Sequence, residues 1–214
     1  MKKKQNAMIE KTKNYVKHLL EGAEPGHDWF HIERVWKIAK KITKEEKGDM
    51  FIVEMAALLH DVDDYKFGGD FSTNARKWLE SLGIGKEYTQ HIIEIIENVD
   101  FWGPAEDGAM KTLEGKIVQD ADRLDALGAI GIARCFSFCG HKKNVFFDPH
   151  IKIKKNMKWS VYKKAMSPAI NHFYEKLLLL KDRMHTKTAK RMAEDRHKFM
   201  EQYLKQFFNE WNGR

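Results

Sequence analysis

The chain has 214 residues, of which 43% are hydrophobic and 12% aromatic, so it can bury a core and is not disordered as a whole. Its net charge of +7 suits an anionic partner, although lysine-rich, solvated helix faces would give the same balance. Two cysteines, Cys135 and Cys139, are too few for a disulfide framework. The N-terminus lacks an apolar signal segment, and no apolar run approaches the roughly 18 residues of a membrane span. We therefore expect a soluble, cytoplasmic protein with no membrane partner.

Apolar residues recur at the helical spacing of three and four along most of the chain. Ile32, Val35 and Ala39 follow this spacing, and the apolar stretch 51–59 is a further helix candidate. No convincing strand alternation appears, so the sequence predicts an all-α helical bundle. The other expected helices cover approximately residues 6–22, 72–82, 86–99, 112–128, 129–140, 161–181 and 186–211.

We expect one domain over residues 1–214, because there are no repeats, no low-complexity tracts and no long linker. A C-terminal helical extension, at about 159–214, is expected to pack on it. Residues 141–158 lack helical periodicity and are rich in lysine and aromatic residues. This segment is either a mobile loop near the substrate or an inert surface loop.

The doublet His60-Asp61 ends a long apolar stretch, so an imidazole and a carboxylate are predicted at the end of a buried helix. Burying an unpaired charge is costly, and a divalent cation is a common compensation. His31 lies 29 residues before the doublet and Asp122 lies 61 residues after it, so a shared site requires separate helices to converge. Taken from the residues alone, His31 could be a hydrogen-bonded core histidine and Asp122 a surface carboxylate. Spacing also does not separate Asp122 from Asp120.

In the contexts HxxRV, LLHDxDD and QDADRLDA, these residues resemble the HD-domain superfamily of metal-dependent phosphohydrolases, in particular small bacterial nucleotide pyrophosphohydrolase-like proteins. The resemblance runs from about residue 20 to the C-terminus. It implies an HD-domain helical bundle in which His31, His60, Asp61 and Asp122 hold one divalent metal ion. Mn is the expected ion, with Mg, Fe, Co and Ni as alternatives. Between the doublet and Asp122 the only further histidine is His91, so we expect a single-metal site, and a contribution of His91 to a second site stays open.

The resemblance also suggests catalytic residues. Asp64 matches a position at which some nucleotidases of the superfamily have an acidic residue that activates water. Asp63 competes for this role, and capping of a helix or loop is the structural alternative for either residue. Arg123 matches a basic position that contacts phosphate in related hydrolases, and an exposed helix arginine is its alternative.

Three further residues could reach the substrate. Arg34 lies three residues after His31, Lys66 lies five after Asp61, and His27 precedes the first metal ligand by four and could equally belong to the turn there.

The expected activity is metal-dependent hydrolysis of a nucleotide, favouring a nucleoside triphosphate, as a pyrophosphohydrolase or a phosphatase. The expected partner is a small nucleotide substrate and not a nucleic acid, and a homodimer is left open. The alternative is a nucleotide- or nucleic-acid-binding HD protein with little turnover.

Overall fold

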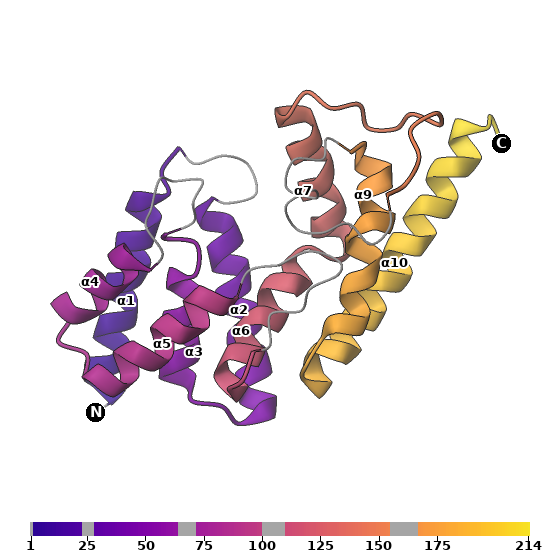
Figure 1. Ribbon diagram of the computed structural model, residues 1–214. Coiled ribbons are helices and arrows are strands. Elements are labelled where there is room, and N and C mark those ends of the chain that lie inside the picture. The colour runs from indigo at the N-terminus through magenta and orange to yellow at the C-terminus, as the bar shows by residue number, and fades with distance from the viewer. Residues whose placement is uncertain (1, 23–27, 64–71, 100–109, 155–166) are drawn as a thin grey trace. The chain divides into compact units, whose positions relative to one another are not determined.

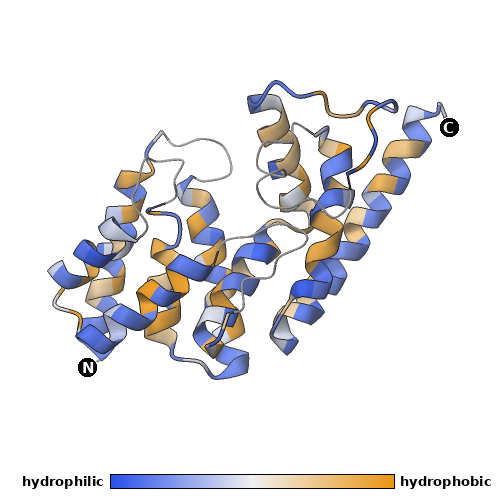
Figure 2. Ribbon diagram, in the orientation of Figure 1, coloured by the Kyte–Doolittle hydropathy of each residue, from blue (hydrophilic) through white to orange (hydrophobic). Residues whose placement is uncertain are grey.

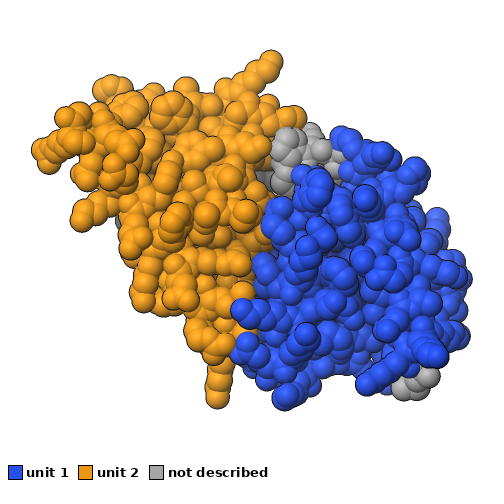
Figure 3. Space-filling model, turned by 180° about the vertical axis from the view of Figure 1, so that it is seen from behind, with its two compact units in different colours: residues 1–100, 108–122 blue, residues 101–107, 123–214 orange. Residues whose placement is uncertain are grey.

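The computed structural model describes residues 2–22, 28–63, 72–99, 110–154 and 167–214 (Figure 1). Every regular element within these ranges is a helix, which confirms the predicted all-α class. None of the described helices is both long and apolar enough to cross a membrane. The chain forms two compact units, residues 1–100 with 108–122 and residues 101–107 with 123–214 (Figure 3). A single domain with an extension from about residue 159 stays a prediction.

Unit 1 is built around a helix that is buried along nearly its whole length. Residues 51–59 of α3 (Met50–Leu59) are all buried, and Figure 2 shows most of this helix in the hydrophobic colour. A helix that is apolar all round suits the centre of a bundle, and α3 packs against α1, α2 and α5. The other helices of unit 1 are α1 (Lys2–Leu19), α2 (Trp29–Glu46), α4 (Thr73–Ser81), α5 (Lys86–Asn98) and α6 (Leu113–Asp125) up to residue 122.

Glu54 is the one charged residue of α3, and its carboxylate is compensated from α2. Trp36 Nε1 donates to Glu54 Oε1 at 3.1 Å, and Lys40 Nζ lies 3.3 Å from the same oxygen. Lys40 also lies over the Trp36 ring, 4.1 Å from its centroid. A buried carboxylate with a donor and a cation avoids most of the cost of isolation. These contacts join α2 to α3.

Aspartates fix where the two central helices begin. The Asp28 side chain accepts a hydrogen bond from His31 N at 2.9 Å at the start of α2. The Asp49 side chain accepts from Phe51 N at 2.9 Å and Ile52 N at 3.2 Å at the start of α3. Both are N-caps, which satisfy backbone N–H groups that have no partner within the helix. The first cap also holds the turn that carries His31.

Unit 2 contains α7 (Gly128–His141), α9 (Ala169–Glu175), the 3₁₀ helix η2 (Leu177–Arg183) and α10 (Lys187–Trp211). α10 packs against α7 and η2, and α9 packs against the same two elements. The turn into α7 is tight: a Cβ on Gly131 would lie 2.2 Å from the Ala126 carbonyl oxygen, and Gly128 has φ +73°. Both positions therefore favour glycine.

The prediction of one helix over residues 161–181 is wrong within the described part of that range. α9 begins after Pro168, which is its N-cap residue, because proline is tolerated at a helix start but disrupts a helix interior. Lys176 has φ −140° and ψ −60°, which interrupts the α-helix, and the chain continues as the 3₁₀ helix η2.

A buried ion pair stabilises the end of α6, where unit 2 begins. Asp125 has no solvent exposure, and Arg134 Nη1 lies 2.7 Å from its Oδ2. Arg196 donates to the Leu124 carbonyl oxygen. Burial lowers the pKa of Arg196, and the nearby Asp125 charge acts in the opposite direction. The end of α6 is thus bonded to side chains from α7 and α10.

Replacing Asp125 by Asn should lower the free energy of unfolding by about 2 kcal/mol, because Arg134 and Arg196 would face a neutral group in a largely buried place. Urea unfolding measures this change. The control is Glu194→Gln, which breaks a 3.4 Å pair with Lys181 whose side chains are 28% and 45% exposed, and it should cost less than about 1 kcal/mol. Equal losses in the two variants would contradict the assignment of Asp125 as a buried structural charge.

Candidate metal centre

Three segments of unit 1 bring two imidazoles and two carboxylates together. His31 lies in the first turn of α2, His60 is the C-cap residue of α3 with Asp61 directly after it, and Asp122 lies on α6. His31, His60 and Asp61 are buried, whereas the Asp122 side chain is 30% exposed. The four side chains predicted to share one site therefore lie in one place, open to solvent on the Asp122 side.

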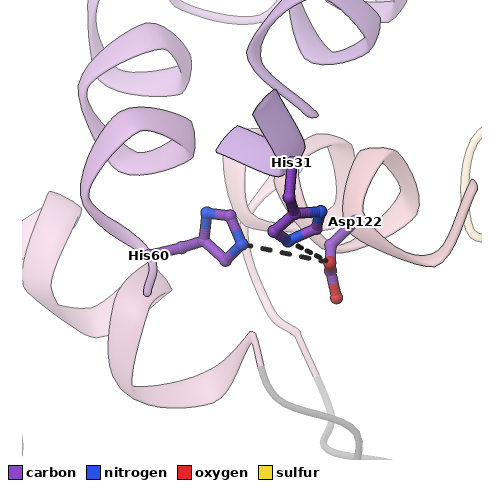
Figure 4. A group of neighbouring side chains, drawn as sticks. All are labelled: His31, His60 and Asp122. Atoms are coloured by element: carbon purple, nitrogen blue, oxygen red, sulfur yellow. Dashed lines mark ion pairs between the residues drawn. The ribbon is translucent and has the colours of Figure 1, made fainter. Parts of the chain in front are cut away.

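The distances between these groups suit a single ion. His31 Nε2 lies 3.5 Å from both Asp61 Oδ2 and Asp122 Oδ1, and His60 Nε2 lies 3.5 Å from Asp61 Oδ1 and 3.9 Å from Asp122 Oδ1. One ligand atom from each of His31, His60 and Asp122 lies within 4.8 Å of the others (Figure 4). Ligands about 2.1 Å from one ion lie about 3 to 4 Å from one another. Small side-chain adjustments would thus complete the coordination.

The backbone of α3 sets the orientation of His60. His60 Nδ1 lies 2.9 Å from the Ala57 carbonyl oxygen, one turn earlier in the chain. A carbonyl only accepts hydrogen bonds, so Nδ1 carries a proton, and Nε2 is the ring nitrogen whose lone pair can bind a metal. Nε2 is the atom that faces the two aspartates. This is the support that metal-binding histidines commonly have.

The donor set itself fits a divalent cation. In this largely buried place, the negative charges of the two carboxylates repel each other unless a positive charge lies between them. Imidazole nitrogens with carboxylate oxygens suit first-row divalent metals, and four ligands leave two positions of an octahedron for water or substrate. The residues present therefore fit the metal that the HD resemblance implies.

α6 contributes Asp122, and a side-chain amide on the same helix fixes its position. Gln119 Nε2 donates to the carbonyl oxygens of Asn98 at 3.1 Å and Val99 at 3.3 Å, which ties α6 to the end of α5. Asp120 is fully buried, whereas Asp122 belongs to the group of potential ligands. The choice of Asp122, which sequence spacing left open, agrees with this geometry.

Asp63 caps a helix. Its Oδ1 accepts from Asn74 N at 3.0 Å and its Oδ2 accepts from Ala75 N at 2.8 Å, in the first turn of α4. The formal N-cap residue, Ser72, makes no side-chain cap bond, so Asp63 serves the start of α4 from a distance. The capping alternative thus describes Asp63. Sequence reasoning could not identify its partners, because nothing local marks a cap from eleven residues away.

The other predicted residues are less fully placed. His27, Asp64 and Lys66 lie outside the described residues, and Arg34 is half-buried on α2. Arg123 is buried in unit 2, where its Nη1 donates to the Arg183 carbonyl oxygen and lies 3.3 Å from His185 Nε2. Arg123 is therefore not the exposed helix arginine that was its alternative. The roles of these residues toward substrate stay predictions.

His91 lies next to a glutamate. Its Nε2 is 3.8 Å from Glu114 Oε2, and Glu114 Oε1 accepts from Asp49 N at 2.8 Å. His91 is thus associated with the start of α6. Whether His91 contributes to a second metal ion stays open.

Comparison with known proteins assigns the family. Residues 29–127 match the model of the HD domain, and a bacterial protein is 39% identical over 210 residues, covering 95% of this chain and 93% of that relative. The chain belongs to the HD-domain superfamily of metal-dependent phosphohydrolases. The relative is protein YpgQ of Bacillus subtilis. The resemblance inferred from the HD doublet and its flanking motifs is confirmed.

Solved structures share the fold along nearly the whole chain. An HD-superfamily hydrolase from Bacillus thuringiensis is 45% identical with a TM-score of 0.78, covering 98% of this chain and 100% of its own. A protein from Lactobacillus plantarum is 33% identical with a TM-score of 0.86, covering 97% and 98%. B. subtilis YpgQ, crystallised in complex with ADP, is 37% identical with a TM-score of 0.79, covering 97% and 96%.

Removing one ligand from so small a set should abolish tight metal binding. We expect His60→Ala and Asp61→Ala to weaken affinity for a divalent ion by more than about 100-fold, since even outer-shell changes cost about 10- to 100-fold. Titration calorimetry with Mn²⁺ on the metal-stripped protein measures this. His18→Ala, which changes an exposed histidine of α1 in the same unit, is the matched control and should keep wild-type affinity. Stoichiometric, tight metal in both ligand variants would show that the ion is held elsewhere.

Proposed function

We propose that this protein hydrolyses nucleotides, with a nucleoside triphosphate as the preferred substrate and Mn²⁺ as the metal ion. The observation that carries the proposal is the convergence of His31, His60, Asp61 and Asp122 in a chain of a phosphohydrolase superfamily. The complex of its relative YpgQ with ADP supports a nucleotide ligand. The enzyme would act either as a pyrophosphohydrolase, which releases pyrophosphate, or as a phosphatase, which releases the terminal phosphate.

The mixed ligands support the metal part of the proposal. Carboxylate oxygens suit Mn²⁺ and Mg²⁺, and imidazole nitrogens suit ions such as Fe²⁺ and Ni²⁺. We propose Mn²⁺ as the ion, with Mg²⁺, Fe²⁺, Co²⁺ and Ni²⁺ as the alternatives that the ligand types leave open. When bound, the ion supplies positive charge that polarises a phosphate oxygen and a water. Two hydrogen bonds hold the ligands in position. His60 Nδ1 is bonded to the Ala57 carbonyl oxygen, and the Gln119 amide fixes α6, which carries Asp122.

Asp64 is our candidate for the residue that orients the attacking water or accepts its proton. It follows Asp63, whose two carboxylate oxygens accept from backbone N–H groups of α4. Both carboxylate oxygens of Asp63 are thus already engaged in capping α4. Asp64 is therefore the stronger of the two adjacent candidates for general base catalysis.

Cations that contact phosphate complete the proposal. We assign this role to Arg123, Arg34 and Lys66, with His27 as a further substrate contact. Arg123 also donates to the Arg183 carbonyl oxygen, so its guanidinium, which has five N–H donors, can combine a structural bond with a phosphate contact.

The second candidate is a nucleotide-binding HD protein with little turnover. A relative that binds ADP is compatible with it, because binding does not require hydrolysis. Incubation with nucleoside mono-, di- and triphosphates and cyclic nucleotides in the presence of Mn²⁺, with products resolved, separates the two. Tight nucleotide binding without any product would favour the binding protein.

Two neighbouring aspartates should respond differently to the same substitution. We expect Asp64→Asn to keep metal affinity and lose about 100-fold or more in kcat, because the general base is removed. Asp63→Asn should keep most of the activity and lose about 1 kcal/mol of unfolding free energy, because one of its two cap bonds is lost. Metal titration, steady-state kinetics and urea unfolding of both variants provide the comparison. Wild-type rates for Asp64→Asn would reject Asp64 as the base.

A triphosphate should be a better substrate than its monophosphate. Each extra charge-assisted contact contributes about 1.5 to 3 kcal/mol, so two additional phosphates in contact with cations give a preference in kcat/KM of more than about 100-fold if additive. The measurement compares ATP with AMP at saturating Mn²⁺. Hydrolysis of the monophosphate alone would refute the preference.

A further inference from the structure

The excess positive charge of this protein lies in one short segment. Residues 141–166 contain eight lysines, one aspartate, and neither arginine nor glutamate, so their net charge is +7. The whole chain has 38 basic and 31 acidic residues and the same net charge. The other 188 residues therefore contain 30 of each sign and are neutral overall. Positive charge concentrated in one segment indicates binding to an anionic surface more strongly than the same charge spread over many helix faces would.

The described part of this segment beyond α7, residues 142–154, exposes apolar side chains among its lysines. We name it the basic-apolar loop. Val145 is 53% exposed, Phe146 51%, and Ile151 and Ile153 39% each. Lys142, Lys143, Lys152 and Lys154 are exposed between and beside these residues, and Trp211 at the end of α10 is 47% exposed.

Ring contacts hold the first half of the loop against the C-terminal end of α10. The Phe147 ring centroid lies 4.8 Å from that of Trp211 and 5.5 Å from that of Phe208, in edge-to-face arrangements. Phe146 contacts Phe207 and Trp211 at 6.2 and 6.4 Å. Such pairs stabilise a defined arrangement. The exposed half of Phe146 is therefore presented from an anchored backbone.

Two buried polar side chains of α9 hold the second half. Asn171 Nδ2 donates to the Ile151 carbonyl oxygen at 2.9 Å, and Glu175 Oε1 accepts from Lys154 N at 2.9 Å. Both side chains belong to residues that are 2% exposed. The backbone of residues 151–154 is thus bonded inward while the side chains of Ile151, Ile153 and the lysines are exposed. A surface ordered before binding loses less entropy when it binds.

We propose that the basic-apolar loop binds an anionic lipid bilayer, with its lysines at the headgroup phosphates and Val145, Phe146 and Ile153 at the boundary with the acyl chains. Lysines interleaved with aliphatic and aromatic side chains are the composition of interfacial membrane-binding segments. This does not require a membrane-spanning helix. The expectation of no membrane partner came from the absence of such a helix and is revised here for the membrane surface.

Two other occupants suit the loop less well. A symmetric pair of copies would bring the same lysine-rich face against itself, and like charges in an interface repel. A nucleic acid would use the lysines and could stack on Phe146 or Trp211, but Val145, Ile151 and Ile153 offer it neither hydrogen bonds nor rings. A bilayer uses both kinds of side chain.

The charge part is tested by sedimentation of the full-length protein with phosphatidylcholine vesicles that contain or lack phosphatidylglycerol. The wild type should bind only the anionic vesicles. The variant Lys143→Ala/Lys152→Ala/Lys154→Ala should bind about 100-fold more weakly, at about fivefold per lysine if additive. The control Lys2→Ala/Lys3→Ala/Lys4→Ala removes the same charge from α1 and should lose less than about threefold, since charge outside the contact is screened. Equal losses in the two variants, or equal binding of the wild type to neutral vesicles, would overturn the proposal.

The apolar part is tested with Val145→Ser/Ile153→Ser, two side chains without ring contacts. Insertion predicts that the wild type keeps part of its vesicle binding at high salt, whereas this variant is released there, with at least about tenfold weaker partition. An unchanged thermal unfolding midpoint confirms that the variant is folded. Complete release of the wild type at high salt, or binding to single-stranded DNA but not to vesicles, would overturn the proposal. Concentration-dependent dimerisation that is lost in Val145→Ser/Ile153→Ser, without vesicle binding, would likewise assign the loop to a second copy.

Discussion

The candidate metal centre depends on the burial of α3. Residues 51–59 are buried, and His60 and Asp61, which follow them directly, are only 6% and 5% exposed. His60 bonds to the carbonyl of Ala57, so the helix itself aims the imidazole, and Asp61 brings a carboxylate to the same place. Electrostatic interactions are strong there and unpaired charge is costly. The fold that buries the doublet thereby favours binding of a cation.

Five aspartates of unit 1 fall into two chemical groups. Asp28, Asp49 and Asp63 accept hydrogen bonds from backbone N–H groups at the starts of α2, α3 and α4. Asp61 and Asp122 face imidazole nitrogens. A carboxylate bonded to backbone donors fixes the start of a helix. Two of these caps begin the helices that lead to His31 and His60, so an acidic residue of this unit need not take part in the chemistry of the centre.

Sequence alone predicted those features that local patterns encode. Apolar spacing found α2 and α3, and the chemistry of a buried His-Asp doublet indicated a metal site, whereas the choice of Asp122 over Asp120 came from family resemblance. The helix predicted over residues 161–181 failed because an apolar pattern does not report the backbone break at Lys176. The cap formed by Asp63 depends on a contact with α4, which no neighbouring residue in the chain reveals. Tertiary partners, more than residue types, were the missing information.

The distribution of charge also limits how the centre can stabilise phosphate. A net charge of +7 suggests a long-range field that attracts any anion, but the chain outside residues 141–166 is neutral. On the proposed function, a triphosphate would be stabilised by the ion and by individual cations within contact distance, because charge farther away than the Debye length of about 8 to 10 Å is largely screened. The lysine-rich segment is correspondingly free to serve a different anionic surface.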